Sequence, residues 1–151
     1  MTAGAWVTYN HTPLIVGNAT VDLDAAGTLR VVLIGSGYTP ARTHTLWSDI
    51  SANEVSASNG YAAGGYTLTQ TYTRSGSTST LDADDPTWAI TTATVSAWTA
   101  VLMHKAGATL TANDLPLAYC ILDIASAPHT VSPGNSLTLQ LNVAGIFTIG
   151  D

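Results

Sequence analysis

Alternation of apolar and hydroxyl-bearing residues is the feature that most limits how this chain can fold. In residues 66–73, the side chains of Tyr, Leu, Gln and Tyr alternate one by one with four threonines. The same period of two recurs over 95–103 and 137–143, and residues 28–34 form a nearly continuous run of β-branched residues and leucine. A period of two places alternate side chains on opposite faces of a strand, so these runs predict strands. No run has the period of a long helix.

Turn-forming residues separate these runs and set the expected architecture. Asp24 to Gly27 lies between 19–23 and 28–34, which predicts a hairpin. Further strands are expected from Trp88 onward, at 117–124 and at 146–149, with loops at 75–80, 105–114 and 125–135 and a turn at 81–86. Seven or eight short strands of this kind predict an all-β fold, either an antiparallel β-sandwich or a partly open barrel.

The stretch 37–69 is the one long segment that does not begin as a regular strand. Leu46, Trp47 and Ile50 recur at a spacing that predicts a short helical turn near residues 41–50. Asn59-Gly60 and Gly64-Gly65 predict two tight bends with positive φ. His44 is expected to form a hydrogen bond within this loop.

The charge of the chain excludes several classes of function. The net charge is −6 and only four residues are basic, so the chain lacks the Lys/Arg surface of a nucleic-acid-binding protein or a polybasic membrane address. Only 9% of the residues are charged, against about a quarter in an average protein. Such a surface suits a subunit packed against other proteins, although β-sandwiches also favour threonine in general.

The length and the two ends of the chain predict its organisation. A chain of 151 residues can bury a core without metals or disulfides, and we expect an N-terminal arm at 1–13 followed by a single β domain at 14–151. The arm is mixed and polar around Trp6 and Tyr9, a composition typical of segments that become ordered on a partner. No signal peptide is evident and Cys120 is the only cysteine, so we expect synthesis in the cytoplasm.

Metal, cofactor and catalytic patterns are weak throughout the sequence. Asp82, Asp84 and Asp85 are spaced for a shared cation, but the EF-hand glycine and glutamate are missing, so an acidic turn before Pro86 is the preferred interpretation. The four histidines show no close pair of the kind that zinc sites use. No nucleophile elbow, phosphate loop or dinucleotide pattern occurs. We therefore expect no enzyme activity, metal or cofactor, although sequence alone does not exclude a carboxylate pair built from separate strands.

The aromatic residues offer either a protein interface or a sugar-binding platform, because both use large rigid rings. Trp88 begins an alternating strand, so core packing is its expected role. The rings in less regular segments or in the candidate arm are the predicted interface residues: Trp6, Tyr9, Trp47, Tyr61 and Tyr66.

Several short motifs occur in one order along most of the chain. They are Tyr38-x-Pro40, His44, Ser48-Asp49-Ile50, Glu54, Gly60-Tyr61-x-x-Gly64-Gly65, Leu68, the run from Asp82 to Trp88, Pro116-Leu117-Ala118-Tyr119, Ile124, Ser132-x-Gly134 and Gly145-Ile146-Phe147. This order resembles a group of small virion structural proteins of tailed bacteriophages, over Tyr38 to Ile149. Each motif alone is common, whereas their order and spacing are not. The segment 1–13 lies outside the resemblance, and a role for it as a capsid-contacting arm is a separate hypothesis.

The resemblance implies a non-enzymatic component of a phage particle. Its most specific implication is a capsid decoration, or cement, protein that sits on the outer shell as a trimer and bridges major capsid subunits. Such a protein is made in the cytoplasm of the host bacterium and ends on the virion surface. A neck, tail or fibre-associated subunit, with carbohydrate binding through exposed aromatic rings, is the alternative. A glycan hydrolase or depolymerase is the third interpretation.

Overall fold

A computed structural model describes residues 4–123, 128–141 and 145–149 of the chain. Strands account for 38% of the residues and helix for 9%, and the sheets are antiparallel, which confirms the all-β prediction. The described residues form twelve strands instead of seven or eight, because several expected strands are broken into shorter ones. Within this part of the chain, the sheets do not close on themselves into a barrel.

The largest sheet has five strands in the order β1-β9-β8-β2-β3. In that order the strands are β1 (Val7–Thr8), β9 (Leu115–Ile121), β8 (Thr99–His104), β2 (Leu29–Ile34) and β3 (Tyr66–Thr67). Five of the six residues of both β2 and β8 are buried, since both faces of these strands are covered. The apolar sequence of 28–34 thus forms an interior strand, as its composition indicates.

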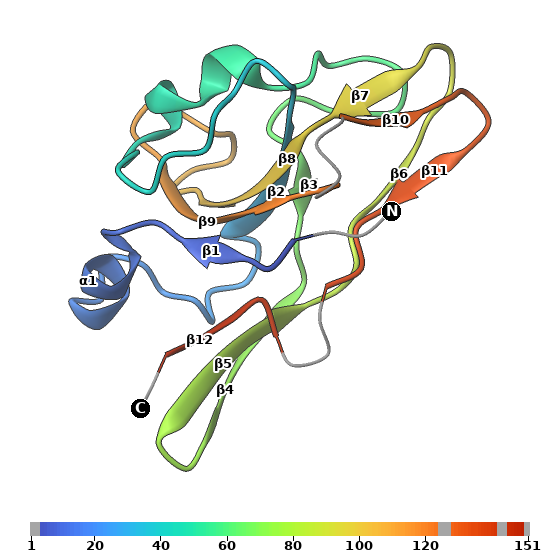
Figure 1. Ribbon diagram of the computed structural model, residues 1–151. Helices are drawn as coiled ribbons and strands as arrows, with labels where there is room; N and C mark the ends of the chain where they lie inside the picture. The colour runs from blue at the N-terminus through green and yellow to red at the C-terminus, as the bar shows by residue number, and fades with distance from the viewer. Residues whose placement is uncertain (1–3, 124–127, 142–144, 150–151) are drawn as a thin grey trace.

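Three smaller sheets extend from this one (Figure 1). The first contains β12 (Phe147–Ile149), β5 (Thr78–Ala83) and β4 (Gln70–Ser75), in that order. The second pairs β11 (Ser136–Thr138) with β6 (Thr87–Ala89), and the third pairs β10 (His129–Val131) with β7 (Val95–Ala97). Side chains from all four sheets, including Leu81, Trp88, Val95 and Leu102, belong to one core.

The predicted hairpin between 19–23 and 28–34 is wrong. The only helix with α geometry in the described chain, α1 (Thr12–Gly17), is followed by turns instead of a strand at 19–23. Asn18 accepts hydrogen bonds from the backbone and hydroxyl of Thr20, and Ala19 has a φ of 60°, so the backbone bends here. These local bonds satisfy polar groups that a strand would have paired in a ladder.

The expected loop at 75–80 is also wrong, because β4 and β5 form a tight hairpin. Ser75 pairs with Thr78, which leaves only Gly76 and Ser77 in the turn. The expected turn at 81–86 begins too early, since Leu81–Ala83 still belong to β5. Residues 75–80 are polar, so their composition predicted a loop. Residues 78–80 instead form part of a strand because β4 lies beside them, across a turn of only two residues.

Other strand boundaries differ more modestly. The run 95–103 is split at Trp98 into β7 and β8, which belong to different sheets. The expected loop 125–135 contains β10. Of the described part of the run 137–143, only Leu137 and Thr138 lie in a strand, which is β11. The strand expected at 117–124 is β9, which ends at Ile121; Ile124 and residues 142–143 lie outside the described residues.

Residues 41–53 contain two short 3₁₀ turns, η1 (Trp47–Asp49) and η2 (Ser51–Asn53), close to the expected helical turn. The Asp49 carboxylate accepts hydrogen bonds from the backbone N–H groups of Thr45 and Leu46, which holds the first of these turns. Both predicted bends are confirmed, because Asn59-Gly60 and Gly64-Gly65 all have positive φ.

Residues 4–13 of the N-terminal segment pack against the rest of the domain and do not form a free arm. β1 pairs with β9 through Val7 opposite Tyr119, and the Tyr9 ring is fully buried. The expected boundary between residues 13 and 14 falls inside α1, whose first residue, Thr12, donates its hydroxyl hydrogen to the carbonyl oxygen of Leu117. Packing against β9 therefore continues across the expected boundary.

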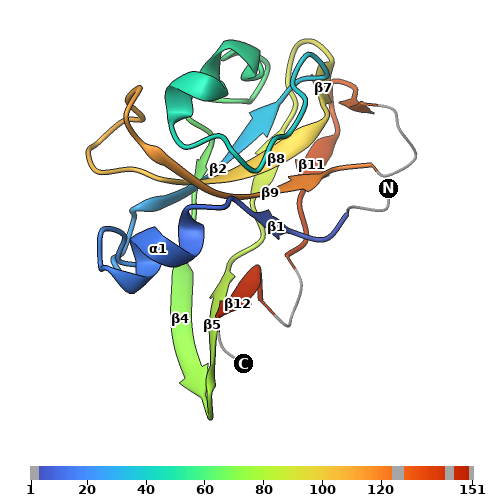
Figure 2. The ribbon, with the colours of Figure 1, turned by 60° about the vertical axis from the view of Figure 1, so that its left-hand side comes forward.

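The hairpin β4–β5 projects away from the rest of the molecule (Figures 1 and 2). Its strands pair over six residues, from Gln70 opposite Ala83 to Ser75 opposite Thr78. Residues 73–77 are all exposed, while Leu81 near the base is fully buried. The base of the hairpin thus belongs to the core, and its outer half does not.

Candidate functional site

The structure divides the five predicted interface residues into two groups. Tyr9, Trp47 and Tyr61 are buried, with at most 6% of their surface exposed, so their rings serve the core of this chain. Trp6 and Tyr66 are half-buried and pack against the edge of the core. The Tyr66 hydroxyl donates a hydrogen bond to Asp84, and its ring lies edge-on to Trp88. Trp6 lines a hollow that opens to the surface.

The Glu54 carboxylate organises the irregular stretch 37–69. Its Oε1 atom accepts hydrogen bonds from the Tyr61 hydroxyl, at 2.8 Å, and from the backbone N–H of Gly64, at 2.6 Å. The Tyr61 oxygen in turn accepts a bond from the backbone N–H of Leu33 in β2. Burial and the neighbouring Glu54 charge raise the pKa of Tyr61, so its hydroxyl stays protonated as a donor. These contacts tie the loop to the five-stranded sheet.

A second chain of polar contacts ties the same stretch to the N-terminal segment. The hydroxyl oxygens of Tyr9 and Tyr38 lie 3.0 Å apart, and the Tyr38 oxygen lies 2.9 Å from Nδ1 of His44. The hydrogen bond expected of His44 is therefore confirmed. Burial raises the pKa of Tyr9 well above its usual range. Tyr38, His44, Glu54, Tyr61 and Gly64 in these networks belong to the ordered motifs of the sequence, and here they maintain the fold, whereas Tyr9 lies outside those motifs.

The acidic run 82–85 is occupied by local hydrogen bonds. Asp84 accepts bonds from Tyr66 and from the backbone N–H of Thr69, and Asp85 accepts one from the backbone N–H of Leu141. No group of three or more His, Cys, Asp or Glu side chains placed to hold a metal ion occurs in the described part of the chain. The run joins the base of the hairpin to the rest of the domain.

Two hollows of the described surface lie beside the N-terminal segment, near the edge strands β1 and β12. One has a volume of about 370 Å³ and is lined by Trp6, Cys120, Leu139 and Ile146 among others. The second, of about 230 Å³, is lined by residues that include Pro13 and Phe147. Both hollows have residues 4–13 on one side and residues 145–149 on the other, so we call them together the β1–β12 groove.

Two properties make the β1–β12 groove a candidate site for protein binding. β1 and β12 are each the outermost strand of their sheet, so each has one edge with no neighbouring strand among the described residues. No residue that lines either hollow is charged. Unpaired edges attract additional strands, and an uncharged surface can be buried without the cost of removing ions from water.

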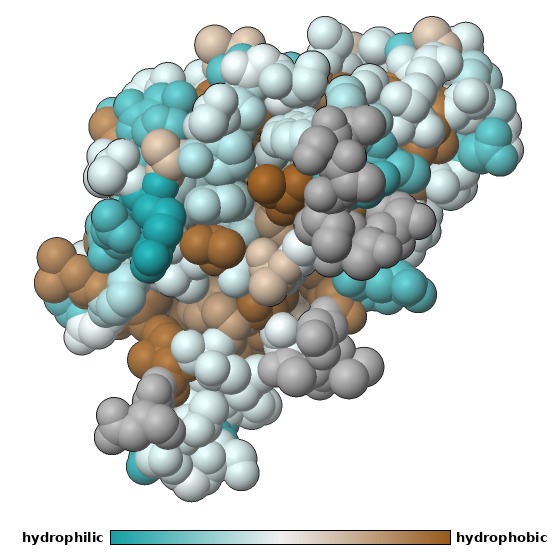
Figure 3. Space-filling view, viewed as in Figure 1, coloured by the Kyte–Doolittle hydropathy of each residue, from teal (hydrophilic) through white to brown (hydrophobic). Residues whose placement is uncertain are grey.

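Apolar surface continues from the groove onto α1. Leu14 is the large hydrophobic residue with the greatest exposure in the described chain, at 67%. The space-filling view shows apolar surface gathered around α1 and β12, beside a mostly hydroxyl-covered hairpin (Figure 3). The alternation of the sequence did not reveal this site, since the edge position of a strand depends on which strands it pairs with.

A third hollow, of about 290 Å³, is polar and lies on another part of the molecule. Glu54, Ser56, Ser58, Asn59, Thr94 and Ser96 contribute to its lining. Its lining contains no aromatic residue, so it lacks the flat ring on which sugars commonly stack. One oxygen of its only carboxylate already serves Tyr61 and Gly64.

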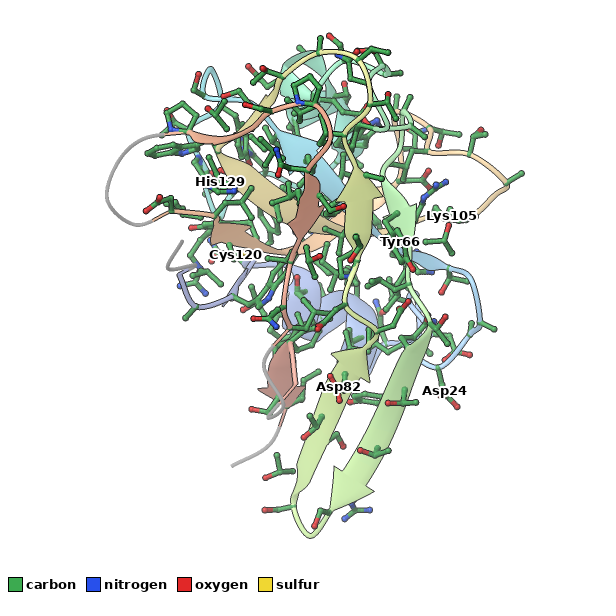
Figure 4. The ribbon with its side chains drawn as sticks, turned by 90° about the vertical axis from the view of Figure 1, so that its right-hand side faces the viewer. Asp24, Tyr66, Asp82, Lys105, Cys120 and His129 are labelled. Atoms are coloured by element: carbon green, nitrogen blue, oxygen red, sulfur yellow. The ribbon has the colours of Figure 1, made fainter. Side chains whose placement is uncertain are left out.

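Cys120 lies in β9, with 1% of its surface exposed, at the inner wall of the groove (Figure 4). Burial raises the pKa of its thiol to about 12. We therefore expect the native thiol to react with Ellman's reagent at pH 8 at least about a hundredfold more slowly than the thiol of the chain unfolded in guanidinium. Absorbance at 412 nm measures both rates. Complete reaction of the native protein at the unfolded rate would contradict the burial of Cys120.

Comparisons with protein-family models, curated proteins and solved structures find no match for this chain. No helix among the described residues is long and apolar enough to cross a membrane. The sequence resemblance and the β1–β12 groove are thus the observations from which a function can be argued.

Proposed function

We propose that this chain is a structural subunit of a bacteriophage virion, and specifically a capsid decoration protein. In this role it binds the outer shell and stabilises it by bridging major capsid subunits. Its partners are the major capsid protein and further copies of itself, as a trimer. The proposal includes no enzyme activity, no cofactor and no nucleic acid.

The observation that carries this proposal is the β1–β12 groove. A protein that binds by surface area needs apolar surface and unpaired backbone groups more than it needs a reactive cluster. The groove offers both, because its smaller hollow is lined by residues of the edge strands β1 and β12 and neither hollow has a charged residue in its lining. The exposed Leu14 widens the apolar surface beside it.

The composition supports the same proposal. Only 9% of the residues are charged, so neighbouring subunits can approach closely with few ions to desolvate. The motifs that resemble phage virion proteins maintain the fold through Glu54, Tyr61 and Tyr38. Proteins that act through their outer surfaces would share motifs of this kind because the motifs preserve the fold.

The number of copies per particle tests the decoration role directly. In purified phage particles that contain this chain, we expect about one copy for each copy of the major capsid protein. Only the icosahedral lattice offers hundreds of equivalent binding sites. Quantitative mass spectrometry with isotope-labelled peptides of both proteins measures the ratio. A handful of copies per particle would contradict decoration and favour the neck or tail.

The alternative role, as a neck, tail or fibre-associated subunit with carbohydrate binding, has less support from the side chains. Trp47 and Tyr61 are buried, so these rings are not available to stack on a sugar. Under this alternative, the polar hollow at Glu54 and Ser96 is a surface on which a glycan would bind through hydrogen bonds. Binding on a glycan array that is lost in the Ser96→Trp variant, which fills this hollow, would favour the alternative.

A further inference from the structure

The three-stranded sheet has two outer edges, and the backbone N–H and C=O groups of one edge could pair with those of the other. Among the described residues the order is β12-β5-β4, so β12 has no neighbouring strand on one side and β4 has none on the other. Strand edges of this kind join readily to other strands, because their N–H and C=O groups are otherwise left to water. In one copy the two edges lie on opposite sides of β5, so they can meet only between different copies.

The projecting end of this sheet is the tip of the β4–β5 hairpin, and it is exposed. Residues 73–77 of the hairpin are exposed, and hydroxyl groups and glycine make up most of this tip. A two-stranded ribbon by itself is marginally stable in water, and it gains stability when another strand or surface covers it. Asp82 lies toward the base of the hairpin, away from the tip (Figure 4).

Charge favours contact between the hairpin of one copy and the groove of another. The chain has a net charge of −6, so two copies repel each other over most of their surfaces. The groove lining is uncharged, which removes this repulsion locally. The tip carries Arg74, one of only four basic residues, so the hairpin is the end that another negatively charged copy attracts.

We propose that copies of this chain associate head to tail, with the β4 edge of one copy paired to the β12 edge of the next inside the β1–β12 groove. The three-stranded sheet then continues from copy to copy, and the exposed hairpin tip becomes covered by residues of β1, α1 and β12. Because the donor and acceptor surfaces differ, the interface is heterologous. Heterologous interfaces produce closed rings or open filaments, and the arrangement proposed here is a closed ring of three or more copies. This deepens the self-association within the proposed function, but its test needs no phage particle.

Two matched substitutions test the proposal. Thr73 in β4 and Thr148 in β12 are both exposed, so Thr73→Glu and Thr148→Glu each place a carboxylate in the interface with little effect on the folded chain. We expect the unmodified chain to run as a ring in size-exclusion chromatography with light scattering, and each variant alone to run as a monomer. Thr91→Glu, at an exposed position away from both surfaces, is the control and should keep the ring.

Mixing the two variants distinguishes head-to-tail association from other arrangements. The Thr148→Glu chain keeps an intact hairpin and the Thr73→Glu chain keeps an intact groove, so an equimolar mixture should form a dimer of one copy each. Hydrogen exchange should slow at 70–75 in one partner and at 147–149 in the other. A monomeric unmodified chain, a symmetric dimer, or a mixture that stays monomeric would overturn the proposal. Assembly of a chain that is absent from virion shells would instead contradict only the decoration role.

Discussion

Gly65→Ala is expected to destabilise the protein by at least about 4 kcal/mol, although the substitution adds only one methyl group. Gly65 has a φ of 70°, a conformation that costs an L-residue about 1–2 kcal/mol. A Cβ atom at this position would also overlap the carbonyl carbon and oxygen of Val31 in β2. The loop could accept alanine only by moving away from the sheet, which would break its contacts with Glu54 and Arg30.

Gly76→Ala provides a matched control for this prediction. Gly76 has a similar φ of 61°, but no atom lies within 4 Å of the position its Cβ would take. We therefore expect a loss of only about 1–2 kcal/mol from backbone strain. Urea unfolding followed by tryptophan fluorescence measures both values. Equal losses for the two variants would show that the approach of the loop to β2 is not what requires glycine at position 65.

Tyr61→Phe is expected to lower the free energy of unfolding by about 2–3 kcal/mol. The hydroxyl of Tyr61 is buried, accepts a hydrogen bond from Leu33 and donates one to Glu54. Its removal leaves the Leu33 N–H without this partner and takes one donor from the carboxylate. The lost bonds cost more than an exposed pair would, because buried groups have no water to replace their partners.

Tyr72→Phe is the control for the loss of a phenol oxygen. Tyr72 in β4 is half-buried, and no hydrogen bond from its hydroxyl to the described residues is present. We expect its substitution to change the free energy of unfolding in urea by less than about 0.5 kcal/mol. If Tyr61→Phe were equally mild, the Glu54 network would not be what holds the stretch 37–69 on the sheet.

Several features of the protein follow from short-range sequence alone. The apolar run at 28–34 dictates an interior strand, because continuous burial suits such a strand. The alternation at 66–73 correctly predicts which side chains face inward, but the single strand expected there is wrong, because the run is divided between β3 and β4 in different sheets. The bends at Asn59-Gly60 and Gly64-Gly65 follow from the residues that tolerate positive φ. The burial of Cys120 in an apolar strand was likewise evident from its neighbours.

Tertiary structure decided which of these elements pair and which surfaces remain open. Tyr9, Trp47 and Tyr61 lie in irregular segments, as interface residues often do, yet long-range packing buries all three rings. The segment 4–13 is ordered by β9, more than a hundred residues later, which no local pattern records. The β1–β12 groove has the same origin, because a strand edge is free only when the rest of the fold has left it without a neighbour.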